Sequence, residues 1–171
     1  MIKQTLVLLT VATATALAQA DANAATAAAR MLWEVNREYI TQSATDTPEK
    51  LYAFRPTPEV RTFGEIIGHV AGSQNMFCAL ALGDKAPAED AVEKTAKTKA
   101  ALVAALKKSN EYCAKAYATT DRANAGMVDL FGQQRSKLFT LLMNASHDAE
   151  HYGNLVTYMR INKLVPPSSK R

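Results

Sequence analysis

Residues 133–162 read QQRSKLFTLLMNASHDAEHYGNLVTYMRIN, and this stretch decides the fold that the sequence predicts. Apolar side chains recur in it every three or four residues, which is the spacing of a helix that buries one face. The predicted buried face includes Leu142 and Ala149. Pro166 and Pro167 follow the stretch and end the helix.

Three further segments have the same periodicity, and they predict helices over residues 24–43, 62–83 and 98–117. The chain has only seven glycines and no turn dipeptide between β-branched runs, so no sheet is expected. Four amphipathic helices in one domain are typical of an all-α four-helix bundle.

The first predicted helix carries an apolar stripe that we expect to face the core, formed by Met31, Leu32, Val35, Tyr39 and Ile40. Thr62 and Glu65 form a capping box that opens the second helix, and Gly83 is suited to end it.

Two long connections separate these helices. Residues 84–96 are polar and link the second helix to the third. In the shorter link between the first and second helices, one helical turn is expected near residues 49–52. Residues 119–132 are expected to form a loop whose Leu130 and Phe131 pack onto the core.

The chain has three histidines, His69, His147 and His151. Residues i and i+4 project from the same face of a helix, so His147 and His151 can bind one metal ion and His69 can complete a three-nitrogen site. The alternative is three structural histidines, each bonded to a backbone carbonyl. The segment also resembles the H-E-x-x-H pattern of metalloproteases, but Asp148 occupies the position of the catalytic glutamate, which disfavours a protease.

Three protein ligands leave a coordination position for a water or a thiol, so no catalytic side chain is assigned from the sequence. Asp148, Tyr152 and Tyr158 are the candidates to assist proton transfer. Asp148, Glu150 and Asn144 are the candidates to accept the second N–H of a metal-binding histidine.

Residues 1–20 have a positive start, an apolar stretch and an Ala18-Gln19-Ala20 site, which is the layout of a cleaved signal peptide. Residues 21–171 then form a single domain that is periplasmic or secreted, with no stable membrane span after cleavage. The whole chain has a net charge of +4, but its basic residues are interspersed with acidic ones, so we expect no nucleic-acid partner. The expected partner is an unknown small-molecule substrate, and a homodimer is left open.

Cys78 and Cys113 would enter an oxidising compartment after export. Composition alone leaves open whether they are paired or are two buried free thiols.

Residues 147–160 read HDAEHYGNLVTYMR, and residues 62–70 read TFGEIIGHV. Together with the Pro-Pro exit they resemble the signature of the DinB (DinB/YfiT-like) family of metal-dependent four-helix-bundle enzymes. The resemblance implies a bundle whose middle two helices are parallel and joined by a long crossover. It also implies a divalent metal, zinc or nickel, on His69, His147 and His151. Parallel middle helices would place Cys78 and Cys113 at similar heights, which favours a disulfide between them.

The sequence therefore predicts an exported metalloenzyme of hydrolase or thiol-transferase type, whose metal activates a water or a thiol. The alternative is a non-catalytic bundle protein of the cell envelope that binds a metal or a small ligand.

Overall fold

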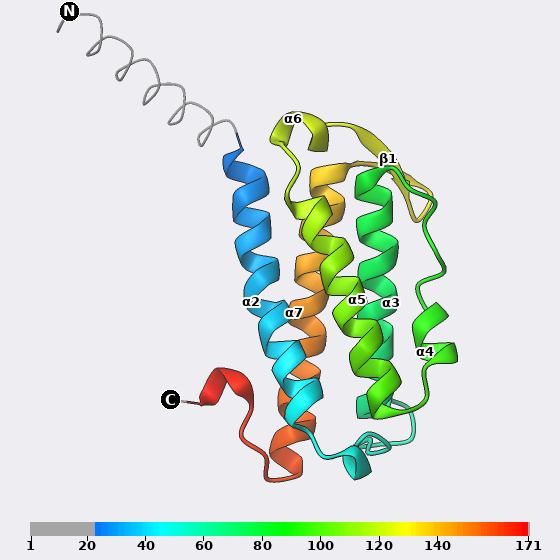
Figure 1. Cartoon of the computed structure of the whole chain (residues 1–171), viewed down its shortest axis with the longest axis vertical. Helices are drawn as coiled ribbons and strands as arrows, with labels where there is room; N and C mark the ends of the chain where they lie inside the picture. The colour runs from blue at the N-terminus through cyan, green and yellow to red at the C-terminus, as the bar shows by residue number, and fades with distance from the viewer. Residues whose placement is uncertain (1–22, 171) are drawn as a thin grey trace, which may run out of the picture.

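The computed structural model describes residues 23–170, and the predicted signal peptide lies outside them. Four long helices form its body: α2 (Ala24–Asp46), α3 (Phe63–Leu82), α5 (Lys99–Tyr117) and α7 (Lys137–Ile161). α2 and α7 run in one direction, and α3 and α5 run together in the opposite direction (Figure 1). The predicted all-α four-helix bundle with a long crossover between the second and third helices is confirmed.

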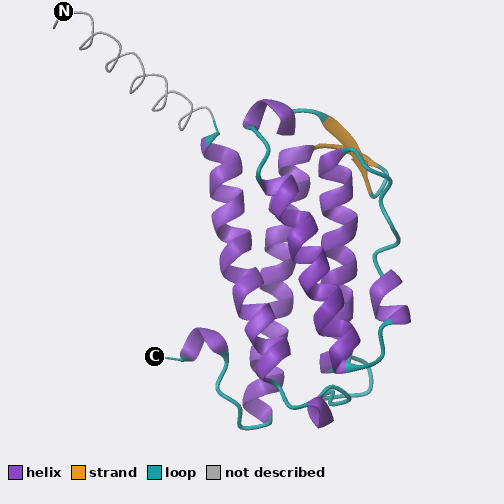
Figure 2. Ribbon diagram, in the orientation of Figure 1, coloured by secondary structure: helices purple, strands orange, loops and turns teal. Residues whose placement is uncertain are grey.

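Short elements lie in the connections between the long helices and after the last of them (Figure 2). They are η1 (Glu49–Leu51), α4 (Ala91–Thr95), α6 (Asp121–Asn124), the antiparallel strands β1 (Met127–Leu130) and β2 (Gln133–Ser136), and η2 (Pro167–Ser169). η1 is the helical turn expected after the first helix. Within residues 23–170, no helix has both the length and the apolar character that a membrane span requires.

Side chains fix where the long helices begin and end. Thr62 accepts a hydrogen bond from the backbone N–H of Glu65, whose carboxylate in turn accepts one from the Thr62 N–H, so the predicted capping box is present. Thr98 and Ser136 cap α5 and α7 through their hydroxyls. Gly83 ends α3 in the left-handed conformation that glycine adopts without strain.

The hairpin differs from the loop expected over residues 119–132. Its turn residues are Phe131 and Gly132, with φ of 54° and 78°, rather than the Asn-Gly pair that marks such turns in a sequence. Leu130 is buried, as expected. Phe131 is 66% exposed, but its ring lies edge-on against the buried Phe77 ring, with centroids 6.2 Å apart, so it covers the core from outside rather than entering it.

The buried face of α2 also differs from the predicted one. Ile40 is completely buried and Tyr39 partly buried, as predicted. Met31, Leu32 and Val35 are exposed, whereas Trp33 is almost fully buried. The Trp33 indole stacks on Tyr117, with ring centroids 4.6 Å apart. Burying the large indole in this contact sets the rotation of the helix and leaves the three aliphatic side chains in solvent.

The buried face of α7 also differs in part from the face predicted for the last helix. Leu141, Ala145, Tyr152 and Met159 are buried as predicted, whereas Leu142 and Ala149 are exposed. α7 also buries polar side chains, namely Thr140, Asn144 and Asp148.

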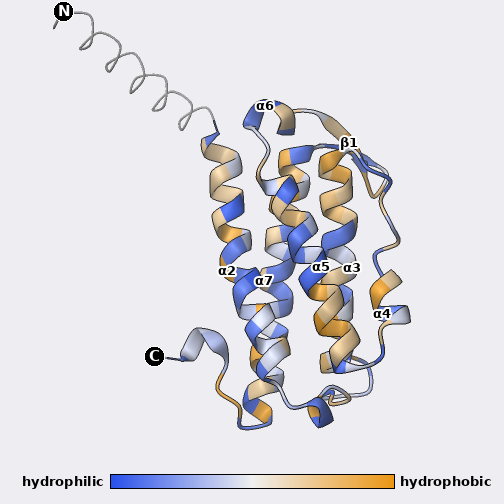
Figure 3. Ribbon diagram, viewed as in Figure 1, coloured by the Kyte–Doolittle hydropathy of each residue, from blue (hydrophilic) through white to orange (hydrophobic). Residues whose placement is uncertain are grey.

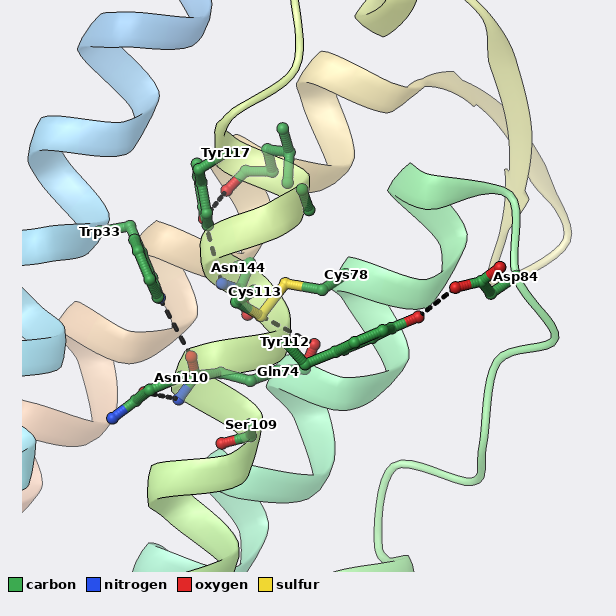
Figure 4. Close-up of a disulfide and its surroundings, with 12 residues drawn as sticks. Trp33, Gln74, Cys78, Asp84, Ser109, Asn110, Tyr112, Cys113, Tyr117 and Asn144 are labelled. Atoms are coloured by element: carbon green, nitrogen blue, oxygen red, sulfur yellow. Dashed lines mark hydrogen bonds between the residues drawn. A yellow bond between two sulfur atoms is a disulfide. The ribbon is translucent and has the colours of Figure 1, made fainter.

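A layer of buried polar groups crosses the bundle (Figure 4). The Trp33 Nε1–H donates to Gln74 Oε1 at 3.0 Å, and the Gln74 amide donates to Asn110 Oδ1 at 3.1 Å. The Asn110 amide then donates to Thr41 Oγ1 at 3.1 Å. These bonds connect α2, α3 and α5, so the polar groups are paired rather than left unsatisfied in the core.

α3 is the central helix and is hydrophobic along most of its length (Figure 3). α5 and α7 pack against it, and the crossover with α4 covers a further side. Consequently most of its residues are buried, and the exceptions are half-exposed. A helix covered on several sides is apolar around most of its circumference, which explains its uniform hydrophobicity.

Three glycines at intervals of four residues form one face of α3: Gly64, Gly68 and Gly72. A Cβ atom at Gly68 would lie 2.9 Å from the Cα of Glu93, and one at Gly72 would lie 2.0 Å from the backbone oxygen of Glu89. Only glycine at these two positions allows the crossover backbone to approach α3 this closely.

Cys78 of α3 and Cys113 of α5 are joined in a disulfide, with their Cα atoms 5.3 Å apart (Figure 4). Both residues are completely buried. Because α3 and α5 are parallel, two cysteines near the same end of each helix come within bridging distance.

The disulfide closes a loop of 35 residues that contains the whole crossover. We expect its removal in a Cys78→Ala/Cys113→Ala variant to lower the free energy of unfolding by roughly 3–4 kcal/mol, since the open loop gains entropy in the unfolded chain. Denaturant unfolding with and without reductant measures this. The double variant should be insensitive to reductant, and equal midpoints for reduced and oxidised wild type would contradict the prediction.

Gly72→Ala should lower the free energy of unfolding by about 1–3 kcal/mol, because the new methyl group collides with the backbone of the crossover. Gly153→Ala is the matched control, since Gly153 lies inside α7 with nothing within 4 Å of its Cβ position. That change should stabilise the protein by about 0.8–1 kcal/mol. Thermal and urea unfolding compare the two, and effects of the same sign would contradict the close approach.

Candidate metal centre

The three histidines come together between α3 and α7. The Nε2 atom of His147 lies 3.1 Å from Nε2 of His69 and 3.0 Å from Nε2 of His151. One ring nitrogen from each of the three histidines lies within 4.8 Å of the other two. His69 and His151 are buried and His147 is half-buried. The histidines singled out in the sequence are therefore brought together in the structure.

Ordinary helix geometry produces this cluster. His147 and His151 are one turn apart on α7, and the antiparallel α3 presents His69 opposite them. The ring centroids of His147 and His151 are 4.3 Å apart, and those of His69 and His151 are 4.8 Å apart. The Phe77 ring, 5.8 Å from the His147 ring, makes one wall of the cluster apolar.

Burial keeps these histidines in the form that binds metals. It lowers the pKa of His69 to about 4 and the pKa of His151 to about 3, with smaller contributions from nearby positive charge. Burial also lowers the pKa of His147. The rings are consequently neutral near pH 7, and a neutral imidazole nitrogen is a metal ligand.

The converging nitrogens cannot satisfy one another by hydrogen bonding. A neutral imidazole has one N–H and one acceptor nitrogen, so a proton on Nε2 of His147 serves only one of its two neighbours. With the protons on Nδ1, three lone pairs point into one small space, an arrangement that a cation stabilises. Imidazole nitrogens suit zinc and nickel, so the cluster is compatible with a divalent metal site.

Two carboxylates of the crossover lie beside the histidines. Glu89 Oε1 is 3.8 Å from Nε2 of both His69 and His147, and the Ser73 hydroxyl donates to it at 3.0 Å. Glu93 Oε2 is 3.7 Å from the other ring nitrogen, Nδ1, of His69. Glu93 is also held by the Arg61 Nε–H, at 3.1 and 3.2 Å from its two oxygens.

The acidic and amide groups predicted to support the histidines lie elsewhere. Asp148 is fully buried, and neither of its oxygens has a hydrogen-bond partner among the described side chains and backbone. This burial raises the pKa of Asp148 well above its usual range. Glu150 is exposed, and the Asn144 amide donates to the Tyr117 hydroxyl at 3.0 Å. Within residues 23–170, none of the three forms a hydrogen bond to a histidine ring. Glu93, 3.7 Å from Nδ1 of His69, and Asn154, 3.4 Å from Nδ1 of His151, lie at the second ring nitrogens instead.

The two candidate tyrosines have structural hydrogen bonds. The Tyr152 hydroxyl donates to the Ser168 hydroxyl at 2.7 Å, and the Tyr158 hydroxyl donates to the backbone oxygen of Arg61 at 2.7 Å. Tyr158 nevertheless lines a cleft of about 230 Å³ that opens beside His151. This cleft gives a small molecule access to one side of the histidine cluster.

Sequence reasoning missed the crossover carboxylates because residues 84–96 show no helical periodicity. A signal was present in α3, where Gly68 and Gly72 mark the face on which another backbone packs closely. Ser73, one turn after His69, is a second signal, since its buried hydroxyl needs a partner.

The fold and the site together define a class of protein. It is a four-helix bundle whose middle two helices are parallel and joined by a long crossover, with three histidines between two helices that could bind a metal. The sequence profile of the DinB superfamily matches residues 32–155. The chain belongs to the DinB superfamily, as the resemblance of its histidine segments predicts.

Solved structures share this fold. A DinB-like protein from Bacillus cereus ATCC 10987 superposes with a TM-score of 0.70 at 18% identity, over 81% of this chain and 93% of that one. A DinB-like protein from Bacillus subtilis gives a TM-score of 0.64 at 19% identity, over 81% and 95%. A mutant of the mycothiol-dependent maleylpyruvate isomerase gives 0.66 at 17% identity, over 76% of this chain and 60% of that one. A search of curated proteins finds no match.

The lowered histidine pKa values make the metal-free protein sensitive to acid. Unfolded histidines take up protons near pH 6.5, whereas folded His69 and His151 resist protonation until about pH 4 and 3. The unfolded state therefore binds more protons in this window, and stability falls as the pH drops from 6.5 towards 4. Each histidine contributes a slope of up to about 1.4 kcal/mol per pH unit.

Urea unfolding in the presence of a chelator, from pH 7.5 to 4.5, measures this slope. A His151→Gln variant is the control, because it keeps every carboxylate and removes one of the shifted histidines. Its stability should depend less steeply on pH than that of the wild type. Identical slopes for the two proteins would show that burial does not lower the pKa of His151.

Proposed function

We propose that this chain is a metalloenzyme in which His69, His147 and His151 hold one divalent ion, zinc or nickel. The observation that carries the proposal is the convergence of three neutral Nε2 atoms beside an open cleft. When bound, the ion would act as a Lewis acid that lowers the pKa of a water or a thiol. The reaction class that this supports is hydrolysis or thiol transfer.

The cleft indicates what the chain itself can contribute to such a reaction. Arg61, Asn154 and Tyr158 place polar groups on its wall, and Ile66 places an apolar one. A volume of about 230 Å³ suits a small organic molecule or part of one. The proposed substrate is therefore a small molecule with a polar group near His151. The similarity to a mycothiol-dependent isomerase supports a thiol as one reactant.

Export is part of the proposal. The signal-peptide pattern of residues 1–20 supports a periplasmic or secreted protein, with residues 21–171 as its mature domain. The Cys78–Cys113 disulfide also supports it, because such bonds persist in oxidising compartments.

A second function, a non-catalytic metal- or ligand-binding bundle protein, is favoured by one specific observation. Glu89 lies 3.8 Å from two of the three histidine nitrogens, where a carboxylate can close the site against substrate. Closed sites of four protein ligands are typical of structural metals.

Metal analysis tests the shared basis of both functions. The protein, expressed without a histidine tag and purified without chelators, should contain about one divalent ion per chain. Zinc at about 100 times its Kd should raise the free energy of unfolding of the apoprotein by about 2.7 kcal/mol. His69→Ala, His147→Ala and His151→Ala should each lose most of the bound metal and of this stabilisation.

Ser146→Ala is the control, since Ser146 is an exposed neighbour on the same helix. It should keep the full metal content. Less than about a tenth of an ion per wild-type chain, both as purified and after incubation with zinc or nickel, would rule out the metal centre.

A further inference from the structure

We propose that Glu89 is a fourth protein ligand, which the crossover supplies to the metal held by His69, His147 and His151. The proposal rests on the metal centre proposed above and deepens it. It assigns a function to the crossover, a segment that contains none of the histidines.

The distances place Glu89 within reach of the metal position. Ligands about 2.0–2.1 Å from a tetrahedral ion lie roughly 3.3–3.5 Å from one another. The Nε2 atom of His147 lies 3.1 and 3.0 Å from those of His69 and His151, and the three ligand nitrogens lie within 4.8 Å of one another. Glu89 Oε1 lies 3.8 Å from Nε2 of both His69 and His147, so an ion held by the histidines would have this carboxylate within reach as a fourth ligand.

Two features hold Glu89 in this place. The Ser73 hydroxyl donates to Glu89 Oε1 at 3.0 Å, and Ser73 is itself completely buried one turn after His69. The bare Cα of Gly72 lets the Glu89 backbone lie directly on α3. The same helix therefore supplies one metal ligand and positions another.

Glu89 has no other strong electrostatic partner. Within residues 23–170, its only ion-pair distances are those to His69 and His147. Glu93 differs, since Arg61 compensates its charge. A divalent ion between the histidines would give Glu89 the positive partner that it lacks.

A carboxylate ligand also sets the charge of the site. Three neutral histidines leave a divalent ion with its full double charge, and Glu89 reduces the net charge to one. The side chain of Glu89 is 34% exposed, so solvent reaches it. An incoming thiol or other anion must then compete with Glu89 for the fourth position.

Cobalt substitution tests this assignment. Wild type, Glu89→Ala and the control Asp90→Asn are loaded with Co²⁺, and Kd and the visible spectrum are measured for each. Asp90 is the control because it is the adjacent carboxylate and its ion pair is with Lys94, at 2.6 Å. Loss of a supporting group near a metal costs about 10–100-fold in affinity, so loss of a ligand should weaken Co²⁺ binding by about 100-fold.

The spectrum adds a readout that misfolding would not imitate. Wild type and Asp90→Asn should show the intense absorption of four-coordinate Co²⁺ with three nitrogens and one carboxylate. Glu89→Ala should have a changed spectrum, and added acetate should restore the wild-type one. Glu89→Ala should also bind a small thiol or azide at the metal about 10-fold more tightly than wild type, since the competing carboxylate is gone.

The outcomes separate the two proposals. A wild-type protein that binds no Co²⁺ would overturn the metal centre itself. A wild-type protein that binds Co²⁺ with the same Kd, spectrum and thiol affinity as Glu89→Ala would leave the histidine site intact and overturn only the role of Glu89.

Discussion

The close packing of the crossover on α3 is the constraint on which the rest of the structure depends. Parallel α3 and α5 cannot be joined by a short turn, so residues 83–98 must return along the length of the bundle. Gly68 and Gly72 remove the side chains that would hold this returning segment away. The same arrangement brings Cys78 next to Cys113 and brings Glu89 next to His69. Topology, cross-link and site composition therefore have a common origin.

Local signals predicted much of the fold. The capping box at Thr62, the terminal Gly83 and the four periodic segments depend on interactions within a few residues, which a sequence displays directly. The histidine cluster was also predictable, because His147 and His151 are one helical turn apart. The contacts between residues far apart in the sequence were the part that could not be predicted. Trp33 fixes the rotation of α2 through Tyr117, 84 positions along the chain, and no local pattern reports that contact.

The site shows the same division between local and distant information. Asp148 and Glu150 are sequence neighbours of the histidines, yet one is buried away from them and the other is exposed. Glu89 and Glu93 are distant from α7 in sequence, and only the path of the crossover brings them to the rings. Spacing along a helix therefore predicted the histidines of the site correctly, but it did not predict which carboxylates lie beside them.

The polar layer of Trp33, Gln74 and Asn110 has a consequence for the alignment of the helices along their axes. Purely aliphatic faces can slide past one another by a turn, about 5.4 Å, at little cost. A slip of that size would break paired amides in the interior, where each unpaired group costs about 1–3 kcal/mol. The layer thereby acts as a longitudinal lock on α3. It fixes the height of His69 relative to α2 and α5, even though it contains no group of the metal centre.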